Sequence, residues 1–360
     1  MFAGCGGLDL GFHQQGYDVV WANDYDEWAA ETFRKNLGDV MFCGDIEQVD
    51  PYKDKSIPSC EFILGGFPCQ DFSMIWKRPG LDGERGNLYK SYLRFVDAKK
   101  PKAFVAENVK GLLTANDGKA IEQIVNDFEK IAPGYLVKPK LYNFAEYGVP
   151  QFRERVLIVG VRMDTGFDFY HPKPTNGPNS SRPYVTAGEA LKGVEKIKLN
   201  NERMNIAEKT KRLLSLIPEG GNFTDIPKSN PLYVKGMISH VYRRMTRNEP
   251  SKTIIAAGGG GTWGYHYPEP RPFTNRERAR LQSFPDDFAF LGSTTEVRRQ
   301  IGNAVPPRGV WATAKALMPL FTGEYEKVDL REKYQKLNGL SVKKRMKYFA
   351  DNPKLLTKVS

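Results

Sequence analysis

Long apolar runs, cysteine and histidine are all scarce in this chain of 360 residues. No stretch approaches the ~20 apolar residues of a membrane span, and no basic region followed by an apolar one opens the chain. We therefore predict neither a membrane span nor a signal peptide. The four cysteines lie in the first fifth of the chain, which argues against a disulfide scaffold and favours a reducing compartment. The four histidines are scattered and CxxC is absent, which argues against structural zinc.

Positive charge, by contrast, is abundant. The net charge is +11, an excess that suits a polyanionic partner such as nucleic acid, although a generally basic surface would give the same figure. Hydrophobic residues make up 40% of the chain, which is enough for a sizeable core. The length fits one large domain, or a large domain with a small one.

Strand-like and helix-like segments alternate in the first half of the chain. In order they are YDVVWAND, EWAAETFRKN, EFILGG, LYKSYLRFVDAKK, KAFVAEN, AIEQIVNDFEKI and RVLIVGVR. This alternation predicts an α/β fold with an open, mostly parallel sheet and helices on both faces.

The alternation stops after Met163, where Pro, Gly, Asn and Ser become frequent. Regular patterns return with TNRERARLQSF and the apolar GVWATAKALMPLF. We therefore predict one large domain from residues 1–163 and 272–326, with a small irregular domain inserted at 164–271. Residues 327–360 are expected to form a basic tail, helical in part.

A glycine turn and two acidic residues suggest a nucleoside ligand. Gly4, Gly6 and Gly7 form a tight turn before a predicted helix, where the backbone can approach a ligand closely. The turn does not complete a GxGxxG pattern, because an aspartate takes the third glycine position. Asp24 and Asp45 follow two successive strands, where an acid could hold ribose. Each acid alone could equally be a helix cap.

Cys69 follows an apolar strand in the stretch EFILGGFPCQDFS. Pro68 stiffens the turn, and Gly65 and Gly66 remove side chains from it. A reactive cysteine must be partly exposed and able to form a thiolate. This placement favours a nucleophile, although a cysteine that only fills a turn remains the alternative.

Polar residues also lie at the end of the predicted strand KAFVAEN and at or just before the start of the predicted strand RVLIVGVR. Glu107 ends a buried strand in AFVAENV, where it could serve as a general acid or merely cap a loop. Arg153 and Arg155, in QFRER, would point to the same side of an extended segment. Such a pair can hold a polar ring or a phosphate, whereas the plainer interpretation is a surface pair.

The motifs GFPCQDFS, ENV, QFRER, TNRERARLQSFPDDF and QIGNAVP occur in this order, and together they resemble the DNA (cytosine-5) methyltransferases, especially those of bacterial restriction–modification systems. The resemblance runs from Phe2 to about Pro306. It implies a Rossmann-like S-adenosylmethionine-dependent methyltransferase sheet with a smaller irregular target-recognition domain, which would be the inserted region.

The resemblance also implies the ligands. S-adenosyl-L-methionine would be the methyl donor and S-adenosyl-L-homocysteine the product, with no metal. The cofactor-binding residues of this chain would be Phe2, Gly4, Gly6, Gly7, Asp24, Tyr25, Asp45, Ile46, Pro68, Leu88, Asn303 and Val305.

The catalytic roles follow from the same resemblance. The Cys69 thiolate would add to C6 of cytosine, so that C5 can attack a methyl sulfonium. Glu107 would donate to N3, and Arg155 would hold O2 with help from Arg153. The cytosine must leave the duplex stack for this chemistry.

Double-stranded DNA would be the partner, and the family usually acts as a monomer. A cognate restriction endonuclease would be a functional rather than a physical partner, in the bacterial cytoplasm. The residues expected to touch DNA are Ser73, Lys77, Arg78, Arg243, Arg244, Arg247 and Lys252.

The sequence departs from the family at its start. In the family a short strand precedes the glycine turn and centres the sheet, whereas Met1 stands here almost where that strand would end. We therefore expect a sheet without this strand, which bears on cofactor binding but not on the catalytic residues.

Two rival functions stay open. An RNA cytosine-5 methyltransferase shares the fold, but GFPCQ and the long inserted region favour DNA. A catalytically silent DNA-binding relative is the other rival, and the presence of Cys69, Glu107 and Arg155 argues against it.

Overall fold

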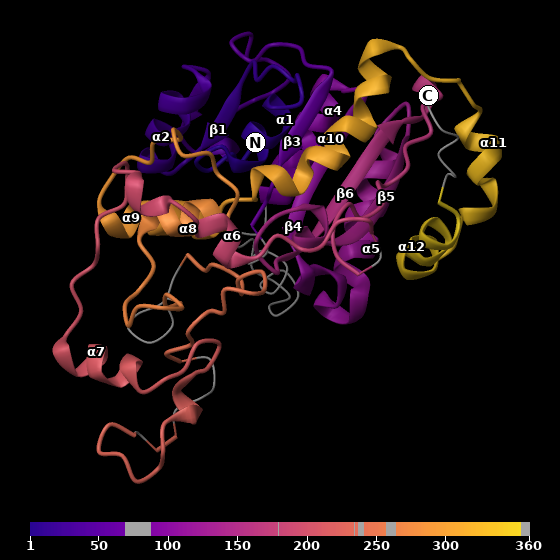
Figure 1. The fold of residues 1–360 in the computed structure, drawn as a ribbon. Coiled ribbons are helices and arrows are strands. Elements are labelled where there is room, and N and C mark those ends of the chain that lie inside the picture. The colour runs from indigo at the N-terminus through magenta and orange to yellow at the C-terminus, as the bar shows by residue number, and fades with distance from the viewer. Residues whose placement is uncertain (69–87, 179, 234, 237–240, 257–263, 354–360) are drawn as a thin grey trace, which may run out of the picture.

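The computed structural model describes residues 1–68, 88–178, 180–233, 235–236, 241–256 and 264–353 (Figure 1). The ribbon shows strands layered between helices, and a part carrying α7 (Glu208–Ser215) that projects from this body. No helix in these residues is long and apolar enough to cross a bilayer.

The strands of the described residues form two sheets. The strands are β1 (Ala22–Asp24), β2 (Met41–Cys43), β3 (Phe62–Gly65), β4 (Ala103–Val109), β5 (Tyr135–Asn143) and β6 (Glu154–Arg162). β1 and β2 pair in parallel, and the other sheet has the order β3-β4-β6-β5. β3 and β4 are parallel, whereas β6 runs antiparallel to both of its neighbours.

The α/β class is confirmed, but the parallel arrangement holds only for β1 to β4. β5 was not predicted as a strand, because Pro139 interrupts its pattern. Proline is tolerated on a strand at the edge of a sheet, where the missing N–H can face away from the neighbour. β5 is such an edge strand.

Residues 1–3 link the two sheets. The Met1 ammonium donates to the carbonyl of Leu64 in β3 at 2.7 Å. The Ala3 amide donates to the carbonyl of Asn23 in β1 at 2.9 Å. The start of the given sequence therefore lies between β1 and β3 and forms no strand there, in agreement with the expectation from the sequence.

Helices cover both faces of the four-stranded sheet (Figure 1). The helices are α1 (Gly7–His13), α2 (Glu27–Leu37), α4 (Leu88–Lys99), α5 (Lys119–Lys130), α6 (Ala187–Leu191), α7, α8 (Asn275–Leu281), α9 (Thr294–Asn303), α10 (Pro307–Thr322), α11 (Leu330–Tyr334) and α12 (Val342–Asp351). Because side chains alternate along a strand, Phe104 and Ala106 of β4 pack with α4 and α5. Ala103 and Val105 pack with α1 and α10 on the other face.

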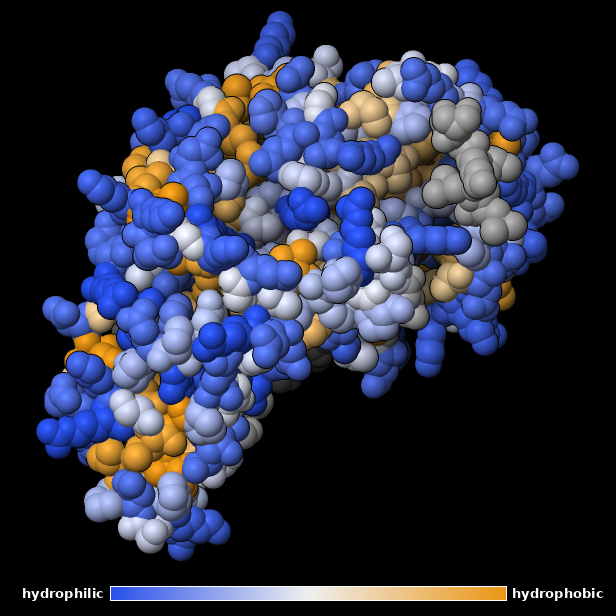
Figure 2. Space-filling view, viewed as in Figure 1, coloured by the Kyte–Doolittle hydropathy of each residue, from blue (hydrophilic) through white to orange (hydrophobic). Residues whose placement is uncertain are grey.

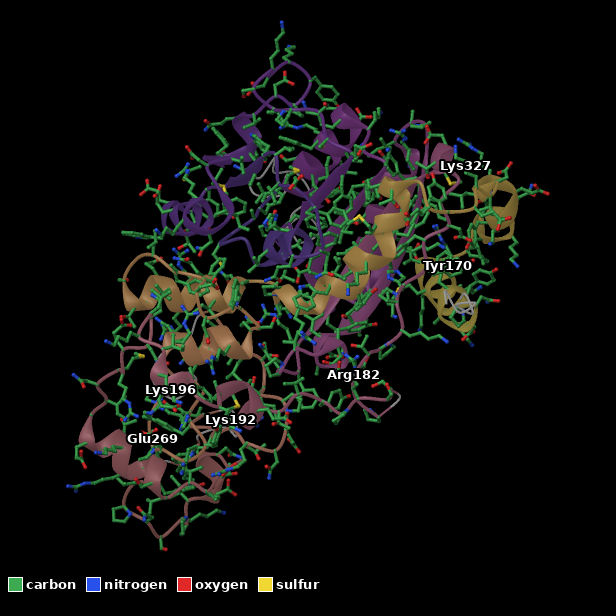
Figure 3. The ribbon with its side chains drawn as sticks, turned by 45° about the horizontal axis from the view of Figure 1, so that its top comes forward. Tyr170, Arg182, Lys192, Lys196, Glu269 and Lys327 are labelled. Atoms are coloured by element: carbon green, nitrogen blue, oxygen red, sulfur yellow. The ribbon has the colours of Figure 1, made fainter. Side chains whose placement is uncertain are left out.

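The projecting part has little regular structure and a small core of its own. Leu213, Ile217 and Phe223 are buried together there. Figure 2 shows an apolar patch on this part of a face that is otherwise largely hydrophilic. Figure 3 places Lys192 and Glu269 in the same region of the molecule, away from the sheet. The domain boundaries drawn from the sequence remain predictions.

The C-terminal helices α11 and α12 pack against the edge strand β5 rather than hanging free. Lys138 of β5 is buried and forms an ion pair of 2.9 Å with Asp168. Its ammonium lies over the rings of Tyr170, Tyr334 and Phe349, at 4.8, 4.6 and 4.8 Å from their centroids. Figure 3 shows Tyr170 beside these helices. The buried cation thus fastens the C-terminal segment to the sheet.

Candidate functional site

The ends of β3 and β4 meet at one edge of the sheet. The Asn108 side-chain amide donates to the carbonyl of Phe67 at 2.9 Å, which ties the two strand ends together. A Cβ on Gly66 would lie 3.0 Å from an Oε atom of Glu107, a tight contact that a glycine avoids. The backbone just before Cys69 therefore lies against Glu107. Cys69 itself lies outside the described residues.

Glu107 and Arg155 form an ion pair at this edge. Arg155 Nε lies 2.9 Å from Glu107 Oε1, and the two side chains are only 15% and 12% exposed. The antiparallel pairing of β4 and β6 sets Arg155, near the start of β6, opposite Val109, the last residue of β4. Burial raises the pKa of Glu107 above its ordinary value, although the charges of Arg155 and Arg153 oppose the shift. A carboxyl that keeps its proton nearer to neutral pH is suited to general acid catalysis.

Arg153 is placed differently from Arg155. Its side chain is buried, with Nη1 donating to the carbonyl of Ile254 at 3.0 Å. Nη2 donates to the carbonyls of Gly302 and Ala304 at 2.9 and 3.1 Å. The sequence predicts that both arginines hold the substrate, whereas the structure ties the terminal nitrogens of Arg153 to the backbone. Burial lowers the pKa of Arg153 to about 9.

The glycine turn and Asp24 form one unit. Asp24 ends β1, and its carboxylate accepts from the amides of Gly4 at 2.7 Å and Asp26 at 3.0 Å. Gly6 has a φ of 89°, which L side chains rarely adopt, so the turn requires glycine there. Burial raises the pKa of Asp24. Tyr25 is 76% exposed beside it, which leaves an aromatic face open to a ligand.

Two further predicted cofactor residues follow Gly44, whose amide donates to the carbonyl of Asp24 at 2.9 Å. Asp45 follows β2 and accepts from the amide of Glu47 at 2.9 Å, so it also acts as the helix cap that the sequence left open. Ile46 next to it is buried. A Cβ on Gly7 would lie 2.3 Å from the carbonyl oxygen of Val305, so the late QIGNAVP motif packs directly on the glycine turn.

The other predicted cofactor residues lie around the same edge. Phe2 precedes the turn and has a φ of 52°. Pro68 is exposed at the end of the β3 segment, and Leu88 begins α4. Asn303 is exposed at the end of α9. One acid ends β1 and the other follows β2, the ion pair joins the end of β4 to the start of β6, and the late motif packs on the glycine turn. Open α/β sheets bind ligands at the carboxyl ends of their strands.

The predicted DNA contacts differ in their surroundings. Three of them lie outside the described residues: Ser73, Lys77 and Arg78. Arg244 is buried, and its guanidinium donates to backbone carbonyls, among them that of Ile217 at 2.6 Å. This guanidinium binds the backbone of its own chain, so Arg244 does not sit where the sequence prediction requires it.

The remaining predicted DNA contacts lie nearer the surface. Arg247 pairs with Glu219 at 2.9 Å, and both side chains are partly exposed. Lys252 is exposed and lies over the ring of Phe152, 5.3 Å from its centroid. Arg243 is partly buried and has interactions of its own. Arg243, Arg247 and Lys252 stay predictions as DNA contacts.

Two buried glutamines belong to the site and were missed from the sequence. Gln151 and Gln282 are fully buried, and they bond to each other at 2.9 Å. Gln151 is the first residue of the motif QFRER, and Gln282 lies within TNRERARLQSFPDDF. A glutamine amid apolar neighbours was the available signal, since a buried amide requires partners.

Comparisons with known proteins show what the chain is similar to. Residues 1–318 match the family described as C-5 cytosine-specific DNA methylase. The chain is 73% identical over 336 residues to the Type II methyltransferase M.NgoFVII of Neisseria gonorrhoeae, covering 92% of this chain and 89% of that protein. It is 40% identical to the Type II methyltransferase M.BbvI of Brevibacillus brevis, over 95% of this chain and 96% of the other. A methyltransferase encoded within an E. coli prophage has a similar fold, with a TM-score of 0.70 and 22% identity over 89% of this chain and 98% of that one.

Proposed function

This chain belongs to the C-5 cytosine-specific DNA methylases and is a DNA cytosine-5 methyltransferase, and we propose that its reaction depends on Cys69, Glu107 and Arg155. The observation that carries the assignment is the buried ion pair of 2.9 Å between Glu107 and Arg155, set against the backbone that leads into Cys69. One side of a flipped cytosine presents N3 and O2 to donors. An acid and a guanidinium held side by side match these two atoms.

The chemistry proceeds from the residue types. The Cys69 thiolate adds to C6, which makes C5 nucleophilic. Glu107 gives its proton to N3, so that negative charge does not accumulate on the ring, and Arg155 donates to O2. After methylation, a base from the solvent takes the C5 proton, and the electron pair of that C–H bond forms the C5–C6 double bond and expels Cys69 as a thiolate. Glu107 takes back the proton from N3 at the same time, which restores both residues.

The family is S-adenosylmethionine-dependent, and the residues present fit this molecule. When bound, it supplies the methyl group from its sulfonium. Gly4, Gly6 and Gly7 would face its amino-acid end, and Asp24 would accept from its ribose hydroxyls. The exposed ring of Tyr25 and the segment of Asp45 and Ile46 would flank its adenine.

Loss of the Asp24 carboxylate should weaken cofactor binding. Asp24→Ala removes the ribose acceptor and releases the amide of Gly4, which Asp24 holds at 2.7 Å. A charged hydrogen bond contributes about 1.5–3 kcal/mol, so the Kd for S-adenosylhomocysteine should rise about 10- to 150-fold. Titration calorimetry measures this. Asp39→Ala is the matched control, because Asp39 is exposed before the amino end of β2. Equal affinity of the two variants would contradict the role of Asp24.

The biological setting is also proposed from relatives. M.NgoFVII and M.BbvI are Type II methyltransferases. By analogy, this enzyme would act as a monomer on duplex DNA in the bacterial cytoplasm, and it would protect host DNA from a cognate restriction endonuclease. Arg243, Arg247 and Lys252 would contact that DNA, with Ser73, Lys77 and Arg78.

Covalent trapping tests the proposed function. Bisulfite sequencing of DNA from an expressing host first defines the target cytosine. A duplex with 5-fluorocytosine at that position should then form an adduct that resists denaturation, because fluorine cannot leave as the C5 proton does. Binding without an adduct would indicate a silent DNA-binding relative, and an adduct formed only with tRNA would indicate an RNA methyltransferase.

A further inference from the structure

Three buried polar side chains connect the start of β6 with two distant parts of the chain. Gln151, Arg153 and Gln282 are 0%, 2% and 0% exposed. Burying such groups is costly unless they are bonded, and each of them has several partners. We propose that Arg153 is a positioning residue, which sets Arg155 relative to the cofactor turn and to the segment 251–256. This inference rests on the proposed function of Arg155.

The first connection runs to the segment 251–256, which lies within the inserted region. The Phe152 amide donates to the carbonyl of Ser251 at 2.8 Å, and the Ile254 amide donates to Gln151 Oε1 at 2.9 Å. Arg153 Nη1 completes the contact by donating to the Ile254 carbonyl at 3.0 Å. Residues 151–153 and 251–254 are thereby held as one unit.

The second connection runs to the cofactor turn. Arg153 Nη2 holds the carbonyls of Gly302 and Ala304, and Gln282 Nε2 holds that of Ile301 at 2.6 Å. Val305, which follows Ala304 in the chain, packs on Gly7 of the glycine turn. The late segment is also closely packed at Gly302, because a Cβ there would lie 2.2 Å from the Ala256 amide nitrogen. A close-packed contact of this kind transmits a displacement.

The third connection is the chain itself. Arg155 follows Arg153 by two residues and bonds Glu107 at 2.9 Å. Loss of the carbonyl bonds of Arg153 would free the start of β6, and with it the guanidinium that faces the base. A misplacement of 1 Å can lower a rate by about 10²-fold even when the changed residue touches no substrate.

A buried arginine elsewhere supplies a matched control. Arg276 of α8 is 0% exposed and donates to the carbonyls of Leu199, Pro285 and Phe288 at 2.9, 2.9 and 2.8 Å. It resembles Arg153 in burial and in its backbone partners. None of these carbonyls belongs to β6, to the glycine turn or to the motif QIGNAVP that contains Val305. A purely structural role predicts the same behaviour for both arginines.

The experiment compares Arg153→Met, Arg153→Lys and Arg276→Met with the active wild-type enzyme. Tm, the Kd for S-adenosylhomocysteine and kcat on the target duplex are measured for each. Both methionine variants should lose Tm. Only Arg153→Met should lower kcat by about 10²-fold and raise the Kd by about tenfold, and Arg153→Lys should recover part of both.

Two results would overturn the inference. One is a kcat and a Kd for Arg153→Met that stay within a factor of about two of those for Arg276→Met. The other result concerns Arg153→Lys, which replaces Arg153→Met in the test if the methionine variant does not fold. A folded lysine variant with wild-type kcat and Kd would contradict a positioning role for Arg153. Because the wild-type enzyme supplies the reference activity, failure of this inference leaves the proposed function untouched.

Discussion

Replacing Cys69 with serine should abolish methyl transfer while DNA binding remains measurable. A serine hydroxyl does not ionise near neutral pH, so the addition to C6 that activates C5 cannot start. Loss of a catalytic nucleophile lowers kcat by about 10⁶-fold in a well-studied case, and a fall of at least about 10⁴-fold is expected here. Transfer of a labelled methyl group to the target duplex measures the rate. A mobility-shift assay with the same duplex measures binding.

Cys60→Ser provides the control for this prediction. Burial raises the pKa of the Cys60 thiol, and it raises that of Cys5 to about 12 and that of Cys43 as well. The cysteines of the described residues are therefore held as thiols, which are poor nucleophiles. Cys60→Ser should retain kcat. Full activity of Cys69→Ser, or an inactive Cys60→Ser that still folds and binds DNA, would contradict the mechanism.

The features that the sequence predicted well are those set by position along a strand. Asp24 and Glu107 stand at or near the ends of apolar runs in parallel strands, and such ends meet at one edge of a sheet. Arg155 precedes the apolar run of β6 and reaches this edge because β6 is antiparallel to β4, an orientation that the sequence did not predict. Their types then indicate their chemistry. The order of the motifs identified the family without any contact being known.

The features that the sequence could not predict depend on backbone acceptors far along the chain. Arg153 was expected beside the substrate, but its partner Ile254 lies 101 residues away. Arg244 was expected on DNA, but it donates to Ile217, 27 residues before it. Local patterns do not show where a distant carbonyl will lie, so a buried arginine and a ligand-binding arginine look alike in sequence. Pro139 concealed an edge strand for a different reason, since proline is disfavoured in strands generally.

Glu107→Gln should lower kcat by about 10²- to 10⁴-fold, the usual contribution of a general acid. Glutamine keeps the size of the side chain and can still accept from Arg155, but it has no proton to give to N3. Burial raises the pKa of Glu107, so the protonated form persists to higher pH than in an ordinary glutamate and is lost as pH rises through that pKa. The wild-type kcat should therefore fall on the alkaline side, where the carboxyl is ionised. In Glu107→Gln this alkaline fall should disappear.

Glu154→Gln is the matched control, because Glu154 is exposed on the neighbouring strand β6 and pairs with Lys110 at 2.9 Å. It should keep both the wild-type kcat and the alkaline fall. Cys69 must be ionised while Glu107 is protonated, so the wild-type profile combines opposite demands and should be bell-shaped. If Glu107→Gln kept the wild-type rate and the wild-type profile, the proton on N3 would have to come from another group. The buried ion pair with Arg155 would then hold the strand ends together without taking part in the reaction.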